Sequence, residues 1–170
     1  VNAISKIAVN THLAGAAGTV AGAAITRLMA GKTDIVMMLN GALAGLVAIT
    51  AEPLTPSPLL AILIGFVGAL IMYFGTKFLE SLQLDDVVGA IPVHMFAGIF
   101  GTLVVPASNP DTNFGTQFLG VISVCVFSFV LSYIVFRTMK ATIGLRISKE
   151  AEKLGTDKAE VGVVAYSIRD

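Results

Sequence analysis

The sequence predicts an all-α polytopic membrane protein, and three observations support this fold class. Hydrophobic residues make up 55% of the 170 residues and charged residues only 13%, whereas a soluble domain carries about 25% charged residues. The mean hydropathy is +0.86. The apolar residues gather in five stretches with short polar joints, and a helix needs about 20 mostly apolar residues to cross a bilayer.

The five apolar stretches define an expected membrane region over residues 1–143. Buried helices of a large soluble protein share this hydropathy, but five in succession favour a membrane. A polar segment at 144–170 follows and is expected to be a cytoplasmic tail with a short helix at 149–154. The predicted transmembrane helices cover residues 8–29, 35–51, 59–76, 87–105 and 114–136.

Small residues recur in the first two predicted helices. "GTVAG" (Gly18, Gly22) and "GALAG" (Gly41, Gly45) both have the GxxxG spacing. In lipid, small residues let helix backbones approach closely. Because GxxxG is common in apolar segments, we interpret both motifs as close helix packing rather than as a dedicated dimer signal.

Basic residues alternate between the joints. The joint after the first helix carries Arg27 and Lys32, the joint after the third carries Lys77, and several basic residues follow from Arg137 onward. The other two joints have no Lys or Arg, and Lys6 before the first helix is the exception to the alternation. The positive-inside rule then predicts a cytoplasmic C-terminus and an N-terminal end that faces outside.

Several function classes find no support in the sequence. The net charge is +0, which offers no electrostatic case for nucleic-acid binding. Cys125 is the only cysteine, so neither a disulfide framework nor a cysteine metal cluster is expected. There is no HExxH, CxxC or phosphate-loop motif. We therefore expect no enzyme activity, no metal and no cofactor.

The segment "DDVVGAIPVHMFAGIFGTL" places a histidine, His94, inside the fourth predicted helix. If the helix continues from Asp86, His94 lies about 12 Å along its axis, near the middle of a hydrocarbon core about 30 Å thick. An ionisable residue at that depth is costly unless it faces a partner or an aqueous path, which indicates a functional site. A neutral imidazole that only bonds to a neighbouring helix is the open alternative.

Pro92 and the two aspartates Asp85 and Asp86 are candidates for shaping a pore around this histidine. Pro92 has no N–H, so the helical hydrogen bond to the carbonyl of Val88 is missing. At membrane depth this carbonyl must be satisfied inside the protein. The proline is either a tolerated kink or the source of a polar atom offered to a pore.

The chemistry of imidazole suits a proton-carrying solute. A neutral imidazole donates a hydrogen bond at one nitrogen and accepts one at the other. His94 can therefore relay a proton for a weak base that must shed it to cross the membrane. His12 lies near the end of the first helix, where interfacial water is within reach, and we expect it to be structural.

Four stretches in this order resemble the second half of the ammonium transporter (Amt/Rh) family. They are "NTHLAGAAG", "NGALAGLVAITA", "DDVVGAIPVHMFAGIFGTL" and "GLRISKEAEKLGTD" with a later "AY". The resemblance spans nearly the whole chain. It implies an eleven-helix fold in the cell (inner) membrane, a homotrimer with one pore per subunit, and ammonium or methylammonium as substrate. The five helices predicted here would be helices seven to eleven of that fold.

The resemblance also implies roles for single residues. His94 falls on the second histidine of the family's twin-histidine pore, whereas the first belongs to a helix that this sequence does not contain. In the tail, a pattern with glycines at intervals implies coupling between subunits and docking of a PII-type signal protein. The residues of that pattern are Gly144, Gly155, Asp157, Gly162 and Tyr166.

Some residues depart from the family pattern. Val161 stands where a histidine is usual, and Val163 and Val164 replace polar residues, which puts the tail coupling in question. "AEPLTPSP" after the second helix differs from the usual proline-cysteine-glycine stretch, which leaves the outer vestibule open.

Two alternatives to a transporter remain. One is an ammonium sensor, in which the Amt-like body is fused through its tail to a histidine kinase or a cyclase. The other is a helical membrane scaffold. The chain begins and ends without the signals of a natural start or stop, so we expect it to continue on both sides.

Overall fold

The computed structural model describes residues 2–165, and all the regular elements described are helices. These residues form two compact units, one ending at Ser123 and one beginning at Val124. The division falls within α5 (Phe114–Thr142). Tyr166 of the predicted tail pattern lies outside the described residues.

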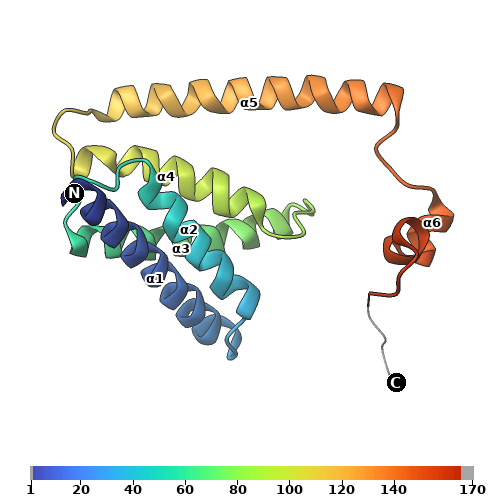
Figure 1. Ribbon diagram of the computed structural model, residues 1–170, viewed down its shortest axis with the longest axis horizontal. Helices are drawn as coiled ribbons and strands as arrows, with labels where there is room; N and C mark the ends of the chain where they lie inside the picture. Colours follow the sequence, from blue (N-terminus) through green and yellow to red (C-terminus); the bar gives the residue numbers. More distant parts are fainter. Residues whose placement is uncertain (1, 166–170) are drawn as a thin grey trace. The chain divides into compact units, whose positions relative to one another are not determined.

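The first unit is a bundle in which α2 holds the central place. It contacts α1 and α3 and also packs against η1 and α4, two helical segments that follow each other along the chain (Figure 1). The 3₁₀ turn η2 continues α4. The elements are α1 (Asn2–Ala30), α2 (Ile35–Thr50), α3 (Pro58–Ser81), η1 (Ile91–Phe96), α4 (Ala97–Val104) and η2 (Val105–Ala107).

Side-chain caps explain where two of these helices begin. Asp34 precedes α2, and its Oδ1 accepts a hydrogen bond from the Met37 N–H at 3.0 Å. Ser57 precedes α3, and its Oγ accepts from the Leu60 N–H at 3.3 Å. Such caps satisfy N–H groups that have no partner within the helix. Pro58 at the first helical position loses nothing there, because its missing N–H would be unpaired in any case.

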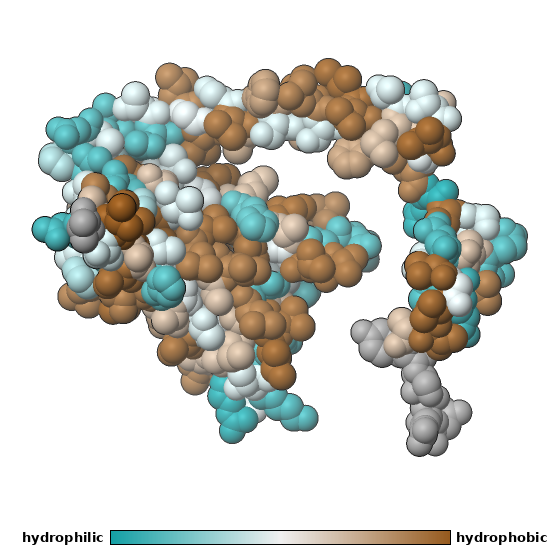
Figure 2. Space-filling view, viewed as in Figure 1, coloured by the Kyte–Doolittle hydropathy of each residue, from teal (hydrophilic) through white to brown (hydrophobic). Residues whose placement is uncertain are grey.

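Among residues 2–165, three helices are long and apolar enough to cross a membrane. These are α1, α3 and α5, whereas Ile35–Thr50 and Ile91–Ala107 are shorter apolar helices. Many large apolar side chains of the first unit stay exposed, such as Leu39 at 56% and Leu63 at 51%. Figure 2 shows these hydrophobic residues as brown surface over the bundle. Lipid or further protein must therefore cover this surface.

Alanines make up five of the nine residues in the two core clusters of the first unit. One cluster joins α1, α2 and α3, and a second joins α2, α3 and the η1–α4 segment. The small side chains allow the close backbone approach that the GxxxG motifs predict. The clusters contain Ala14, Ala48, Ile49, Ala61 and Ile64 in the first, and Ala44, Met72, Val93 and Ala97 in the second.

The helix that carries His94 starts later than the sequence predicts. The expected start was Val87, but Val87 and Val88 form a turn and helical residues begin at Ala90. The reason is Gly89, whose φ of 74° lies in the left-handed region and cannot belong to a right-handed helix. At about 1.5 Å per residue, His94 is then about 6 Å past the helix start instead of about 12 Å past Asp86.

The second unit includes the predicted tail. Its helix α6 covers Lys149–Leu154, as the sequence predicts, and a π-helical turn η3 covers Asp157–Val161. The tail glycines Gly144, Gly155 and Gly162 all have positive φ, at 81°, 94° and 73°. Glycine adopts such angles without strain, so the tail can turn at these three positions.

Candidate functional site

His94 lies on the open side of a helix whose other side is buried. Pro92 and Val93, directly before it, are buried, and Val93 belongs to the second core cluster. His94 itself is exposed, and so are Ile91 and Met95 on either side of it. The imidazole is therefore flanked by apolar side chains at a surface that the described residues leave uncovered.

Asp86 fixes the start of this helix. Its Oδ1 accepts a hydrogen bond from the Ala90 N–H at 2.9 Å, and its Oδ2 accepts one from the Ile91 N–H at 2.8 Å. Both N–H groups belong to the first turn, where no helical carbonyl can reach them. A carboxylate is also favoured at a helix N-terminus by the helix dipole. Asp86 thus holds the helix that presents His94.

Asn40 of α2 supplies the hydrogen bond that Pro92 removes. Its Nδ2 donates to the carbonyl oxygen of Val88 at 2.9 Å. This carbonyl is the one four residues before Pro92, which has no N–H to offer it. The expectation that the freed carbonyl is satisfied inside the protein is confirmed, although the sequence did not indicate which residue does so.

Two glycines make room for this segment. A Cβ at Gly89 would lie 2.8 Å from Asn40 Nδ2, so the amide can approach the turn only because residue 89 has no side chain. A Cβ at Gly75 of α3 would overlap the ring of Phe96 and lie 3.4 Å from the Cβ of Pro92. The helix is thus fitted against α3 on one side and held by Asn40 at its start.

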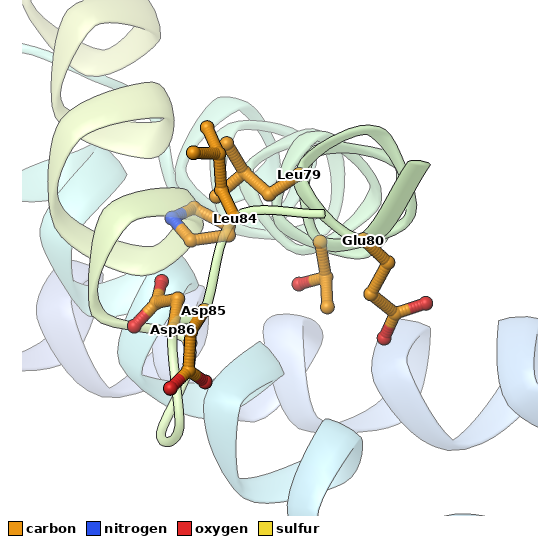
Figure 3. A pocket seen from close by; sticks show the side chains of 8 residues that line it. Leu79, Glu80, Leu84, Asp85 and Asp86 are labelled. Carbon is orange, nitrogen blue, oxygen red and sulfur yellow. The ribbon is translucent and has the colours of Figure 1, made fainter. Parts of the chain in front are cut away.

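A pocket of about 240 Å³ lies between the end of α3 and the start of η1. In Figure 3, Leu79 and Leu84 lie together on one side of it, and the carboxylates of Asp85 and Asp86 lie on the other. Pro92 also lines the pocket, whereas His94 does not. The structure therefore brings together three of the four predicted site residues in this region, and His94 lies two residues after Pro92 on the same helix.

Three of the five tail residues singled out in the sequence, Gly155, Asp157 and Gly162, lie in or beside a loop that Asp157 closes. Its Oδ2 accepts a hydrogen bond from the Ala165 N–H at 3.0 Å, and its backbone carbonyl accepts from the Val163 N–H at 3.1 Å. The hydrogen bond from Ala165 is the main cause that lowers the pKa of the Asp157 carboxyl below its ordinary value of 3.8. Gly162 lies within this loop, and Gly155 precedes it.

His12 makes a local contact of the kind expected for a structural residue. Its ring Nδ1–H donates to the carbonyl oxygen of Ala8 at 2.7 Å, one helical turn earlier. The side chain is exposed. Nothing in this geometry directs His12 toward His94.

Asn10 is a buried polar residue that the sequence reasoning missed. Its Nδ2 donates to the carbonyls of Pro53 and Pro56, each at 2.9 Å, and so holds the loop that departs from the family pattern. In the same loop Glu52 accepts a hydrogen bond from Asn109 at 3.1 Å. An asparagine within an apolar helix is the signal that would have indicated Asn10 and Asn40, because polar groups in such helices need partners.

Cysteine and metal chemistry find no site in the part of the chain that the structure describes. No group of three or more His, Cys, Asp or Glu residues lies close enough there to hold a metal ion. Cys125 is a free thiol.

The sequence profile of the Ammonium Transporter Family matches residues 1–166. The chain belongs to the ammonium transporter family. Ammonium transporter Amt2 of Archaeoglobus fulgidus is 40% identical over 184 residues, which cover 96% of this chain and 39% of that protein. Ammonium transporter Amt1 of Haloferax mediterranei is 34% identical and covers 96% of this chain and 33% of that protein.

Solved structures of family members share the fold. A structure named "Sensor Amt Protein" superposes with a TM-score of 0.84 and 31% identity over 92% of this chain and 42% of its own. Candida albicans Mep2 gives a TM-score of 0.78 and 26% identity over 92% of this chain and 39% of its own. The chain thus spans less than half the length of these relatives, and its family and its apolar helices indicate a multi-pass membrane protein.

Proposed function

We propose that this chain forms one wall of a hydrophobic ammonium pore in which His94 relays a proton. The observation that carries the proposal is the orientation of His94. Pro92 and Val93 anchor the helix in the core, and the imidazole stands on the uncovered side with Ile91 and Met95 beside it. The remaining length of a full family member would cover this side and enclose the ring.

The relay follows from the atoms involved. Ammonium is costly to move through an apolar passage as an ion, whereas neutral ammonia is not. An N–H bond of ammonium breaks, its electron pair stays on the ammonia nitrogen, and the proton passes to the lone pair of an imidazole nitrogen. The other ring nitrogen can release a proton in turn, because imidazole both donates and accepts.

A pair of histidine variants tests this function. His94→Ala should lower ammonium-driven current in proteoliposomes by about 100-fold, the contribution of a positioned acid–base group. His12→Ala is the matched control, because it removes the other histidine of the chain, and it should leave the current unchanged. A current in His94→Ala equal to that of the parent would refute the relay.

The orientation, the location and the partners belong to the same proposal. The basic joints support a C-terminal segment on the cytoplasmic side of the cell (inner) membrane. A homotrimer and a PII-type signal protein docked at the tail follow from the family resemblance. Protease accessibility of the tail in sealed vesicles of known orientation measures directly on which side of the membrane the C-terminal segment lies.

Ammonium sensing is the second candidate. The fold likeness to the structure named "Sensor Amt Protein" motivates it, although the described residues contain nothing that points to an output domain. Sensing predicts a kinase or cyclase coding region after the codon for Asp170. A reading frame without such a region would exclude the sensor and favour the transporter.

A further inference from the structure

We propose that Asn40 is a positioning residue for His94, acting through the carbonyl of Val88. The contacts that support this assignment are independent of what the protein transports. Its consequence for ammonium movement rests on the function proposed above.

The carbonyl of Val88 accepts a hydrogen bond from a side chain of another helix. Pro92 removes the helical N–H that would otherwise reach it, and Asn40 Nδ2 takes that place at 2.9 Å. Asn40 is only 9% exposed. Val88 itself is exposed, but the bond is partly buried on the Asn40 side, and it ties the entrance of η1 to α2.

Asn40 is held firmly enough to serve as a reference point. The backbone of its neighbour Gly41 lies directly against the backbone of Gly18 in α1. Helix backbones in such close contact have little room to shift. The amide of Asn40 also fills the space beside Gly89, so its loss would open a gap next to the left-handed turn.

The path from this bond to the imidazole is short. The carbonyl of Gly89 accepts the N–H of Val93 at 3.2 Å, and Asp86 holds the two N–H groups before it. Val88, Gly89 and the first helical turn therefore move together. Because His94 follows Val93 directly, a displaced turn displaces the ring.

The competing explanation is that Asn40 only satisfies a carbonyl and leaves the ring where it is. Both explanations predict a loss of stability in Asn40→Leu, so stability cannot separate them. Exchange of the imidazole C2 hydrogen with deuterium separates them, because it depends on the surroundings and protonation of each histidine ring. Peptide mass spectrometry reads His94 and His12 separately.

The experiment uses the intact protein in mild detergent. Asn40→Leu should speed C2 exchange at His94 by about tenfold, which corresponds to the loss of one hydrogen bond, and should leave His12 unchanged. Asn40→Gln keeps an amide donor and should restore exchange toward the parent rate. Thr50→Val is the matched control, because it removes a hydroxyl from the other end of α2 that bonds only to Leu46 of the same helix.

Each outcome decides the proposal. Exchange at His94 within about twofold of the parent in Asn40→Leu would overturn it, as would equal rates in Asn40→Leu and Asn40→Gln. If Asn40→Leu does not assemble, Asn40→Ala, which adds no apolar volume, is held to the same threshold. Transport by His94→Ala is a separate readout: normal current there overturns the relay but leaves the exchange result and the role of Asn40 standing.

Discussion

Gly18 and Gly41 face each other across the contact between α1 and α2. A Cβ on either residue would overlap the backbone carbonyl oxygen of the other. The same holds one turn away, where a Cβ at Gly45 would overlap the carbonyl of Ala14. Such contacts let dispersion and weak C–H···O interactions hold two helices where water supplies no hydrophobic drive. The interpretation of both GxxxG motifs as close packing is therefore confirmed.

Gly18→Ala should destabilise the bundle because the added methyl group meets backbone, which cannot swing aside. The expected loss in free energy of unfolding is about 1–3 kcal/mol, typical of overpacking. Titration with SDS in mixed micelles, followed by circular dichroism, measures it. The control is Gly120→Ala, since a Cβ at Gly120 of α5 meets nothing within 4 Å. Equal midpoints for the two variants would contradict the packing argument.

Gly89→Ala should be destabilising for two reasons that a matched variant separates. The left-handed φ of 74° costs a residue with a Cβ about 1–2 kcal/mol, and the methyl group would press on Asn40 Nδ2. Gly31 has a similar φ of 73° but open space around it. Gly31→Ala therefore reports the backbone cost alone. We expect a larger drop in melting temperature for Gly89→Ala, and equal drops would mean that the contact with Asn40 is unimportant.

The start of the His94 helix shows what hydropathy does not contain. Val87 and Val88 continue the apolar run of "DDVVGAIPVH", so the composition predicts helix there. The helix nevertheless does not include these valines, because the positive φ of Gly89 turns the chain before Ala90. A glycine inside an apolar run is compatible with helix packing or with a turn, and only the packing around it selects one.

Asn40 shows the complementary case. The sequence predicts that the Val88 carbonyl requires a hydrogen-bond donor, but it does not predict that Asn40 is this donor. The missing N–H of Pro92 requires a donor for Val88 whatever the fold. The donor lies 48 residues earlier in the chain, so its identity depends on how α2 packs. Likewise, the residue type makes His94 a candidate, but the burial of Val93 next to it determines which side of the helix presents the ring.

The exposed apolar side chains of the first unit lead to a prediction about assembly. Residues such as Phe74 at 54% and Leu63 at 51% exposure need lipid or protein over them. Homo-oligomers mostly close by rotation, and the family resemblance implies three copies. Native mass spectrometry of the intact protein in mild detergent should give the mass of a trimer. A stable monomer or dimer under these conditions would argue against this assembly.

The tail offers a prediction about pH through the loop that Asp157 closes. The Ala165 N–H donates to the Asp157 carboxylate, and this bond keeps the pKa of that carboxyl below 3.8. A group whose pKa is lowered on folding stabilises the folded form above its unfolded pKa. The stabilisation is lost as the pH falls through the lower, folded pKa. At neutral pH the loop should therefore be closed by a fully charged Asp157.

Amide exchange at Ala165 tests this loop against Asp157→Asn, which removes the charge but keeps the size of the side chain. At neutral pH the Ala165 amide should exchange several times faster in the variant. This factor reflects the loss of one hydrogen bond to a charged acceptor, which is weakened because solvent screens the exposed carboxylate. Below the folded pKa the parent carboxyl is protonated, so the two rates should converge. Glu160→Gln changes the same charge in the same turn η3 and should leave the Ala165 amide unaffected. Equal exchange in the parent and Asp157→Asn at neutral pH would show that Asp157 does not hold the loop, and the tail glycines would then form the turns without it.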